Sequence, residues 1–425
     1  MATLLERAGF SAVDAPQEAD LIVVNTCGFI EPAREESRAV LRELAQDRRP
    51  GQQIIATGCY TQRNPDELTQ AVPGIDGVIG TRHWMDVISL VDRLDGACPT
   101  PIRHLPGTTS VGQAIDMPRV AVQGASAYLK IGDGCRRSCA FCAIPLIKGP
   151  GVSRPAAAIL DDAEWLAERG IREIILVAQD TTSYGRDLGT GAELALLLER
   201  MVAAVPQVAW IRTMYAYPGR ITERLIETMA RHPQILPYLD IPLQHAHPDV
   251  LRRMRRPDGI KDVRRTIERL RAAMPGIAIR TTFLAGYPGE TESEFRTLLD
   301  FVAEMAFDRV GVFAYSHEDG TPAASLEDDV PSGLKNERCE RLMEVQQPIS
   351  LAKNQALVGQ TLDVLIEGEG DGLSVGRSYR DAPEIDGLIL IQGDAEQHTN
   401  PPTGEIIPAR ITAALEYDLV AELAE

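Results

Sequence analysis

The stretch GDGCRRSCAFC, from Gly132 to Cys142, contains three thiols at spacings of four and three residues: Cys135, Cys139 and Cys142. A cubane iron–sulfur cluster needs thiolate ligands that converge from a flexible loop, and glycines let the backbone approach such a centre without Cβ clashes. Three thiolates on a four-iron cluster leave one iron without a protein ligand. That iron can coordinate a small molecule and pass an electron to it.

Two other kinds of site use the same residue types. A structural zinc site would need a fourth protein ligand, and no histidine near the loop supplies one. A redox pair could use Cys139 and Cys142 alone, in the C-x-x-C arrangement. At this point the spacing favours the cluster and leaves both alternatives open.

Outward from the loop, the sequence predicts repeated strand–helix units. One strand-like run ends directly before the loop, and similar runs recur at intervals typical of βα repeats. Helical patterns separate them, one of which begins with a T-x-x-E capping box at Thr291 and Glu294. Six such units predict an open (β/α)6 barrel, a partial TIM barrel whose chemistry lies at the carboxyl ends of its strands. The six runs are Ala127–Ile131, Glu173–Val177, Trp210–Met214, Tyr238–Leu243, Ile277–Leu284 and Arg309–Tyr315.

The segment before the barrel predicts a parallel α/β domain. Its strands are the short β-branched runs Leu21–Thr26 and Gln53–Cys59, separated by a charged helical stretch. Cys27 and Cys59 both fall at strand carboxyl ends, where open α/β sheets bind ligands. The alternative for these two cysteines is a pair of buried structural thiols. The proline- and glycine-containing stretch Cys98–Met117 is typical of a linker.

The last 69 residues change character. Glycine-rich turns separate short alternating runs, which predicts a small antiparallel β-barrel. This segment holds fourteen acidic residues and three arginines, a net charge of −11. We therefore expect three domains, at residues 1–115, 116–356 and 357–425, in an overall α/β fold.

Composition limits the class of protein. The chain has 425 residues with a formal net charge of −18, and it contains no run of 18 apolar residues. Glu6 and Arg7 interrupt the start where a signal peptide would be apolar. These features predict a cytoplasmic protein without a membrane partner. The negative charge disfavours nonspecific binding to nucleic acid and favours a basic partner.

The chain resembles the methylthiotransferases among the radical S-adenosylmethionine (SAM) enzymes, and the resemblance covers nearly its whole length. Within this family, the stretches MYAYP, LQHAHPDVLRRMRRP and GRSYRDAPEIDG resemble the branch that modifies a ribosomal protein. The motifs that carry the resemblance are NTCGFI (Asn25–Ile30), ATGC (Ala56–Cys59), the three-cysteine loop, QDTTSYG (Gln179–Gly185), RTMYAYP (Arg212–Pro218), YLDIPLQHAHPDVLRRMRRP (Tyr238–Pro257), RTTFLAGYPGE (Arg280–Glu290), AYSHEDGTPAA (Ala314–Ala324) and GRSYRDAPEIDG (Gly376–Gly387).

The resemblance implies two [4Fe-4S] clusters and SAM as cofactors. One cluster would be held by Cys135, Cys139 and Cys142, and would bind and cleave SAM. Cys27 and Cys59 would hold the second, sulfur-delivering cluster. The family's third ligand lies in an L-G-C-x-K-N motif that this sequence lacks, so we expect it upstream of Met1, with the first strand of the domain. The alternative is a genuine truncation, in which case the second cluster would lack a ligand.

The resemblance also implies a reaction and its partners. The barrel would be the radical SAM core and the C-terminal barrel a TRAM-like substrate-binding domain. The expected reaction is methylthiolation of the β-carbon of an aspartate in small-subunit ribosomal protein twelve, free or in the small subunit, with an electron donor as second partner. Nucleic acid would be contacted at most indirectly. Alternatives are the transfer-RNA adenosine methylthiotransferase, whose terminal barrel should be basic, and a noncatalytic iron–sulfur protein that docks on ribosomes.

Four polar residues are candidates for contact with SAM. Gln179 and Asp180 follow the second barrel strand, where they can hydrogen-bond the methionine or ribose portion. Gln244 and Arg280 lie at or in later strands. Beyond the cluster ligands, the sequence identifies no further catalytic residue.

Overall fold

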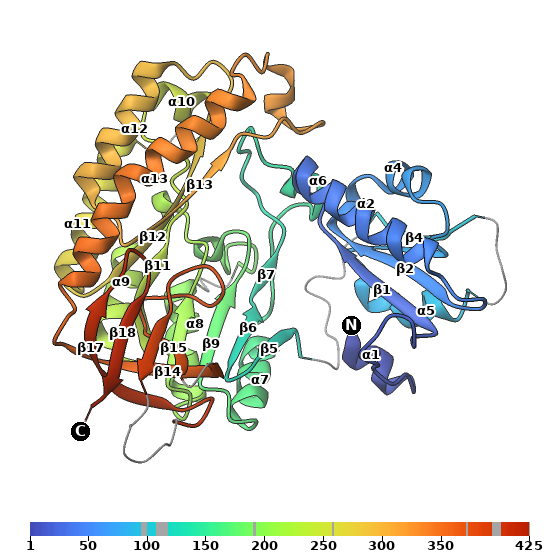
Figure 1. Cartoon of the computed structure of the whole chain (residues 1–425), viewed down its shortest axis with the longest axis horizontal. Coiled ribbons are helices and arrows are strands. Elements are labelled where there is room, and N and C mark those ends of the chain that lie inside the picture. Colours follow the sequence, from blue (N-terminus) through green and yellow to red (C-terminus); the bar gives the residue numbers. More distant parts are fainter. Residues whose placement is uncertain are drawn as a thin grey trace. The chain divides into compact units, whose positions relative to one another are not determined.

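The computed structural model describes residues 1–94, 100–107, 118–189, 193–256, 259–370, 373–392 and 401–424 (Figure 1). The chain forms two compact units. The first comprises Met1–Gln113, Asp133–Val152 and Ser316–Ser325, and the second comprises Ala114–Gly132, Ser153–Tyr315 and Leu326–Glu425. No described helix is both long and apolar enough to cross a membrane.

The first unit is built on a parallel sheet of four strands in the order β1-β2-β3-β4. The β-branched runs expected as strands form β1 (Leu21–Thr26) and β2 (Gln53–Gly58), which pair in register with Thr26 opposite Gly58. Helix α2 (Glu31–Gln46) connects them and buries Leu41 in the core of this unit. The other elements of this unit are α1 (Ala2–Arg7), α3 (Cys59–Arg63), α4 (Pro65–Ala71), β3 (Gly77–Gly80), η1 (Trp84–Asp86), α5 (Val87–Val91), β4 (Ile102–His104), α6 (Ile144–Ile147) and η4 (Pro322–Ser325).

The second unit contains the expected open barrel. Its sheet has the order β13-β12-β11-β10-β9-β6-β5, and the six strands from β6 to β13 run parallel. The prediction of six βα units is confirmed. One strand was not predicted: β5 (Val120–Gln123) pairs antiparallel with β6 and forms one edge. The parallel strands are β6 (Ser126–Lys130), β9 (Glu173–Val177), β10 (Trp210–Thr213), β11 (Ile235–Asp240), β12 (Ala278–Ala285) and β13 (Arg309–Ala314).

Helices pack on the outside of this sheet (Figure 1). Their apolar faces and the strands form one large core that includes Leu198, Ile267 and Phe301. Helix α12 begins at the predicted capping box, with Thr291 and Glu294 bonding each other's backbone N–H groups. The helices are α7 (Ala156–Ala167), α8 (Leu194–Ala204), α9 (Glu223–Arg231), α10 (Pro248–Arg253), α11 (Ile260–Ala273), α12 (Glu292–Met305) and α13 (Ser332–Gln355), with the short turns η2 (Thr181–Ser183) and η3 (Pro218–Arg220). The strands β7 (Gly132–Asp133) and β8 (Val152–Ser153) form a separate pair where the chain passes between the two units.

The C-terminal segment closes into a separate barrel with the strand order β14-β15-β16-β18-β17, as its alternating pattern predicts. The barrel is not wholly antiparallel as expected, because β16 and β18 pair in parallel. Its own core is apolar and includes Val364, Ile389 and Ile411. The strands are β14 (Thr361–Gly370), β15 (Leu373–Arg377), β16 (Ile389–Gln392), β17 (Ile406–Ala414) and β18 (Leu419–Leu423).

A buried ion cluster joins the C-terminal barrel to the first residues of the open-barrel strands. Glu173, the first residue of β9, is fully buried and accepts from Arg212 and from Arg377, each at 2.7 Å. Arg377 belongs to the C-terminal barrel and also donates to Ser126, the first residue of β6, at 3.0 Å. A buried carboxylate needs such cationic partners because desolvation otherwise penalises its charge. The cluster therefore fixes the C-terminal barrel against the amino ends of these strands.

Replacing Arg377 with Met should destabilise this unit strongly. Removing one partner of a buried ion cluster costs about 3–5 kcal/mol, because Glu173 keeps an undercompensated charge. Urea unfolding followed by tryptophan fluorescence would measure the loss, since Trp210 is buried in an apolar cluster that includes Leu365 of the C-terminal barrel. The matched control is Arg410→Met, because Arg410 pairs with Glu422 at the surface of the same barrel, where an exposed pair contributes only about 0–1 kcal/mol. Equal urea midpoints for Arg377→Met and Arg410→Met would contradict a stabilising role of the buried ion cluster.

Candidate functional site

Cys27 and Cys59 lie side by side at the carboxyl edge of the first sheet. Thr26 and Gly58 are paired residues at the ends of β1 and β2, and each cysteine follows one of them directly. Gly28 permits the close approach of the two loops, because a Cβ on it would lie 2.5 Å from Cα of Tyr60 and 2.8 Å from the carbonyl carbon of Cys59. The structure thus confirms the prediction that Cys27 and Cys59 lie at the carboxyl ends of two strands.

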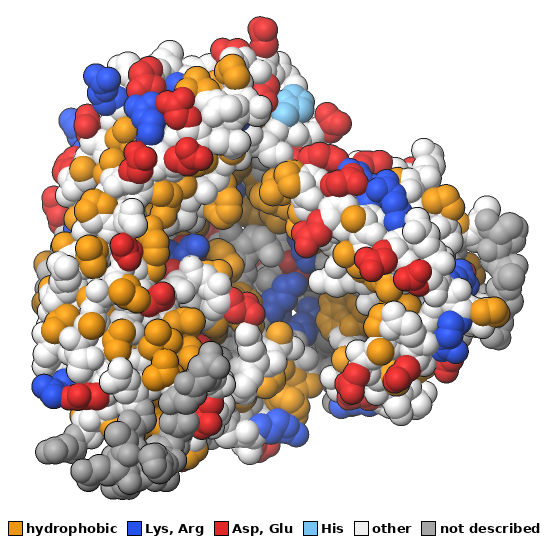
Figure 2. Space-filling model, viewed as in Figure 1, with side chains coloured by type: hydrophobic (Ala, Val, Ile, Leu, Met, Phe, Trp, Pro, Cys, Tyr) orange, Lys and Arg blue, Asp and Glu red, His pale blue; other side chains and the backbone are white. Residues whose placement is uncertain are grey.

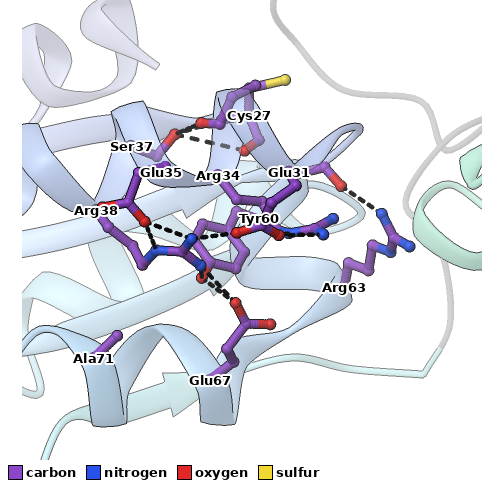
Figure 3. Close-up of polar contacts among 12 residues, drawn as sticks. Cys27, Glu31, Arg34, Glu35, Ser37, Arg38, Tyr60, Arg63, Glu67 and Ala71 are labelled. Carbon is purple, nitrogen blue, oxygen red and sulfur yellow. Dashed lines mark hydrogen bonds and ion pairs between the residues drawn. The ribbon is translucent and has the colours of Figure 1, made fainter. Parts of the chain in front are cut away.

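The Cys27 backbone is held from helix α2. Ser37 Oγ accepts from the Cys27 N–H at 3.1 Å and lies 3.5 Å from the Cys27 carbonyl oxygen. Cys27 itself is exposed. Figure 3 shows its sulfur pointing away from the ion pairs between α2 and the following segments. The thiol is therefore open to a ligand while its backbone is fixed.

Those ion pairs form a dense network beneath Cys27 (Figure 3). Arg38 on α2 donates to Glu67 at 2.6 Å and to the Tyr60 hydroxyl at 2.8 Å, and it also pairs with Glu31. The Tyr60 hydroxyl in turn donates to Glu67 at 2.7 Å. Burial, with the neighbouring Glu67 carboxylate, raises the pKa of Tyr60 to about 12. Tyr60 therefore stays neutral at physiological pH and acts as a hydrogen-bonding support.

The three-cysteine loop belongs to the same unit as Cys27 and Cys59. Gly134 has φ +74° and a Cβ there would lie 2.4 Å from the Pro150 carbonyl oxygen, so only glycine fits this turn. Cys135 N–H donates to the Gly149 carbonyl at 3.1 Å, and Arg137 N–H points to Cys135 Sγ at 3.4 Å. A backbone N–H aimed at a sulfur is the kind of contact that tunes a cluster's thiolate ligands.

The loop is anchored to the first sheet by side chains that follow β3. Arg82 donates to the carbonyls of Ile147 and Leu146, at 2.8 and 3.0 Å. Lys148 donates to Thr81 Oγ1 at 2.6 Å. All five cysteines of the sequence motifs therefore lie in one compact unit. Of the two that match no motif, Cys339 lies in α13 and Cys98 falls outside the described residues.

Gln179 and Asp180 follow β9, as expected, and differ in their surroundings. Asp180 accepts from Thr182 and Ser183, at 2.6 and 2.5 Å, and so shapes the turn η2. The Gln179 side-chain oxygen is buried, and no hydrogen-bond partner for it occurs among the described residues. A buried polar oxygen without a protein partner is costly, so this acceptor is available to a water molecule or a ligand.

Gln244 and Arg280 lie farther round the sheet. Gln244 has φ +75°, unusual for a residue with a Cβ, and its backbone bridges to β12 through Thr282 and Leu284. Arg280, in β12, pairs with Asp240 at 3.0 Å and with Asp386 of the C-terminal barrel at 3.3 Å. Its guanidinium thus has structural partners in this conformation, and its contact with SAM stays a prediction.

Two further residues have features of functional residues that the sequence patterns did not indicate. Tyr215, in the quoted RTMYAYP stretch, has φ +58° and an exposed ring just beyond β10. Strained backbone of this kind clusters at functional sites. Glu318, in the quoted AYSHEDGTPAA stretch, is buried and bonds to Arg34 and Arg63 of the first domain. No local pattern identifies either residue, because backbone strain and long-range pairing leave no periodic signal.

Two groups of histidine and acidic side chains lie close enough together to hold a metal ion. Hydrogen bonds account for both arrangements. Asp86 Oδ2 lies 2.6 Å from His104 Nε2 and 3.3 Å from His83 Nδ1. His247 Nδ1 accepts from the Asp249 N–H at 3.2 Å and so caps helix α10. Both groups have local structural roles.

Family models match three parts of the chain. They are "Uncharacterized protein family UPF0004" at residues 1–80, "Radical SAM superfamily" at 129–302 and "TRAM domain" at 358–424. A ribosomal protein uS12 methylthiotransferase RimO from Roseiflexus sp. (strain RS-1) is 48% identical, over 100% of this chain and 93% of its own length. The protein of the same name from Chloroflexus aurantiacus is 49% identical, over 99% and 94%.

The chain belongs to the ribosomal protein uS12 methylthiotransferase family. The resemblance inferred from the motifs is thereby confirmed. Membership in the radical SAM superfamily implies a [4Fe-4S] cluster and SAM, which fits the loop of three thiols and the orphaned Gln179 oxygen.

The fold has a counterpart among solved structures. The radical SAM methyltransferase TsrM from Kitasatospora setae, with tryptophan and a SAM analogue bound, superposes with a TM-score of 0.56 at 16% identity. The match covers 82% of this chain and 80% of that one. At this identity the likeness shows the shared fold of the uS12 methylthiotransferase chain and TsrM.

Gly28→Ala should destabilise the first unit by about 1–3 kcal/mol, because the added methyl group overpacks the contact with Tyr60. Gly368→Ala is the control, since a Cβ there meets no described atom within 4 Å. Its effect should stay within about 0.5 kcal/mol. Urea unfolding of both variants measures the difference. If Gly28→Ala matched the control, the close approach of the two cysteine loops would be disproved.

Proposed function

We propose that this chain is a radical SAM methylthiotransferase that modifies the β-carbon of an aspartate in ribosomal protein uS12. The observation that carries the proposal is full-length similarity to uS12 methylthiotransferases together with all three cysteines of the cluster loop. The target carbon bears no proton that a side-chain base could remove at neutral pH, so ordinary acid–base catalysis cannot break that C–H bond. The reaction needs cofactor chemistry that the protein positions and shields.

Cys135, Cys139 and Cys142 would hold the first [4Fe-4S] cluster. When bound, this cluster with SAM supplies the one-electron chemistry that opens an unactivated C–H bond. Gln179 would accept a hydrogen bond from SAM through its side-chain oxygen, for which the described residues offer no partner. Asp180, Gln244 and Arg280 would complete the polar contacts at the strand ends.

Cys27 and Cys59 would contribute ligands to a second [4Fe-4S] cluster that delivers sulfur. Their placement on adjacent strand ends, with Cys27 exposed above a fixed backbone, supports this role. The domain division at 1–115, 116–356 and 357–425 would assign sulfur delivery, radical chemistry and substrate binding to successive segments, with the three-cysteine loop of the second segment packed in the same compact unit as Cys27 and Cys59. The protein would act in the cytoplasm, with an electron donor as partner and uS12, free or in the small subunit, as substrate.

The surface charge of the C-terminal barrel supports a basic protein as its partner. Acidic side chains are exposed on its described part, while Arg377 and Arg380 are buried in pairs with Glu173 and Asp308. Figure 2 shows acidic groups over both units on the face displayed. The exposed acids of the barrel are Asp363, Glu367, Glu369, Glu384 and Glu405. A barrel that binds transfer RNA should instead be basic, which disfavours the transfer-RNA alternative.

Cys139→Ser should abolish methylthiolation, because the first cluster would lose a ligand. The test is mass spectrometry of uS12 from a deletion strain complemented with each variant. Cys339→Ser is the control: Cys339 matches no motif, and burial raises the pKa of its thiol to about 11, so it stays protonated. We expect uS12 to lack the methylthio mass in the strain without the gene. Complementation with the wild-type gene should restore it. A methylthio mass that persists on uS12 in the deletion strain would reject the proposed function.

The second cluster can be tested separately. Cys27→Ser should lower the iron and sulfide bound per reconstituted chain while leaving SAM cleavage in place, since each [4Fe-4S] cluster would be held by its own cysteines. Iron content together with 5′-deoxyadenosine release measures both properties. Full iron content in this variant would count against a cluster on Cys27.

A further inference from the structure

The segment Ser316–Ser325 belongs to the first unit, although it follows β13 of the open barrel. It contains Glu318, whose side chain is almost completely buried. Its partner residue Glu31, at the start of helix α2, lies 287 positions earlier in the sequence. Ser316–Ser325 therefore packs in the unit that contains the motif cysteines, although it is far from them in the sequence.

Glu318 makes four charge-assisted or polar contacts. Its Oε1 accepts from the Glu31 N–H at 2.9 Å and from Ser316 Oγ at 2.7 Å. Its Oε2 accepts from Arg34 at 2.6 Å and from Arg63 at 2.8 Å. Helix α2 has no side-chain cap from its own N-cap residue, so the Glu318 carboxylate satisfies an N–H at the positive end of that helix.

Arg63 extends the contact to the cysteine loops. It donates to the carbonyls of Gly28 and Phe29, at 3.0 and 3.3 Å, directly after Cys27. Arg63 is also the last residue of α3, the helix that begins at Cys59. One arginine thus connects Glu318 to the backbone that follows Cys27 and to the helix that begins at Cys59.

The other end of the segment contacts the three-cysteine loop. The Ala323 N–H donates to the Ala140 carbonyl at 2.8 Å, between Cys139 and Cys142. Gly320 lies so close to Leu146 that a Cβ there would be 3.1 Å from its Cδ1 atom. Ser316–Ser325 therefore touches the loops of both cysteine sets within one unit.

We propose that Glu318 is a positioning residue that fixes the Cys27 and Cys59 loops relative to the three-cysteine loop. This inference rests on the proposed function, in which one cysteine set supports radical formation and the other sulfur delivery. A reaction that joins two centres is sensitive to their separation, and a misplacement of about 1 Å can cost about 100-fold in rate. Glu318 would hold that separation constant without touching the reacting atoms.

The test compares Glu318→Gln with Asp319→Asn. Gln keeps the size of the side chain but loses the charge that binds Arg34 and Arg63. Asp319 is the matched control, because its side chain is 98% exposed. Asp319→Asn removes one negative charge, as Glu318→Gln does. Arg63→Lys is a second variant, which keeps a cation beside Glu318 but loses the planar fork that also reaches Gly28.

Two measurements report the position of the loop without any cofactor. Hydrogen exchange of the peptide that contains Glu31 should become faster in Glu318→Gln, because the Glu31 N–H loses its charged acceptor. Alkylation of Cys27 in the apo chain should change its rate as the loop loosens. Asp319→Asn should match wild type in both measurements, and unchanged exchange and alkylation in Glu318→Gln would overturn the proposal.

A third measurement is the amount of 5′-deoxyadenosine released per methylthiolated uS12. We expect this ratio to rise about 10- to 100-fold in Glu318→Gln, with a smaller rise in Arg63→Lys. A purely structural role would lower both products together and leave the ratio unchanged, which would also overturn the proposal. If wild type cleaves SAM but does not modify uS12, the proposed function fails, whereas hydrogen exchange and alkylation still decide the role of Glu318.

Discussion

Buried carboxylates paired with arginines from distant segments organise this molecule. A carboxylate taken out of water needs cationic and hydrogen-bonding partners, because desolvation otherwise opposes its charge. Glu173 meets this need with Arg212 and Arg377, and Glu318 meets it with Arg34 and Arg63. In each case the partners come from different parts of the chain, so the satisfied charge also fixes how those parts pack.

This pairing changes how the charge of the C-terminal barrel is understood. From the sequence, its arginines partly offset its acids. In the structure Arg377 and Arg380 face inward, toward Glu173 and Asp308, and so do the barrel's own Asp381 and Asp386. These inward charges cancel, so the acidic excess of the barrel lies on its other residues. The GRSYRDAPEIDG motif, which distinguishes the ribosomal-protein branch by resemblance, supplies these inward charges. Its Arg377, Arg380, Asp381 and Asp386 pair with residues of the open barrel or its edges. The motif therefore supports the assembly of the barrels, and other residues present the acidic surface.

Local patterns predicted much of the fold. Six strand runs, the Thr291 capping box and the glycine-punctuated barrel depend on neighbours in sequence, and each was found. The boundaries moved by a few residues: the fourth run begins at Ile235 rather than Tyr238. Parallel pairing then placed Cys27 beside Cys59, because equivalent strand ends meet at one edge. The rest depends on long-range contacts. Strand β5 has only four residues, mostly exposed, and the return of Ser316–Ser325 to the first unit has no periodic signal. The left-handed backbone at Gln244 and Tyr215 is imposed by surrounding contacts and not by residue type.

The capping of helix α2 by Glu318 also sets an order of events during synthesis. At about 5–20 residues per second, the 287 residues between Glu31 and Glu318 take about 15–60 s to translate. During that time Arg34 and Arg63 have no access to their shared carboxylate, and the start of α2 is uncapped. The Cys27 loop is therefore held at first by local contacts such as that with Ser37, and the clamp through Glu318 and Arg63 can form only after the open-barrel strands have been translated.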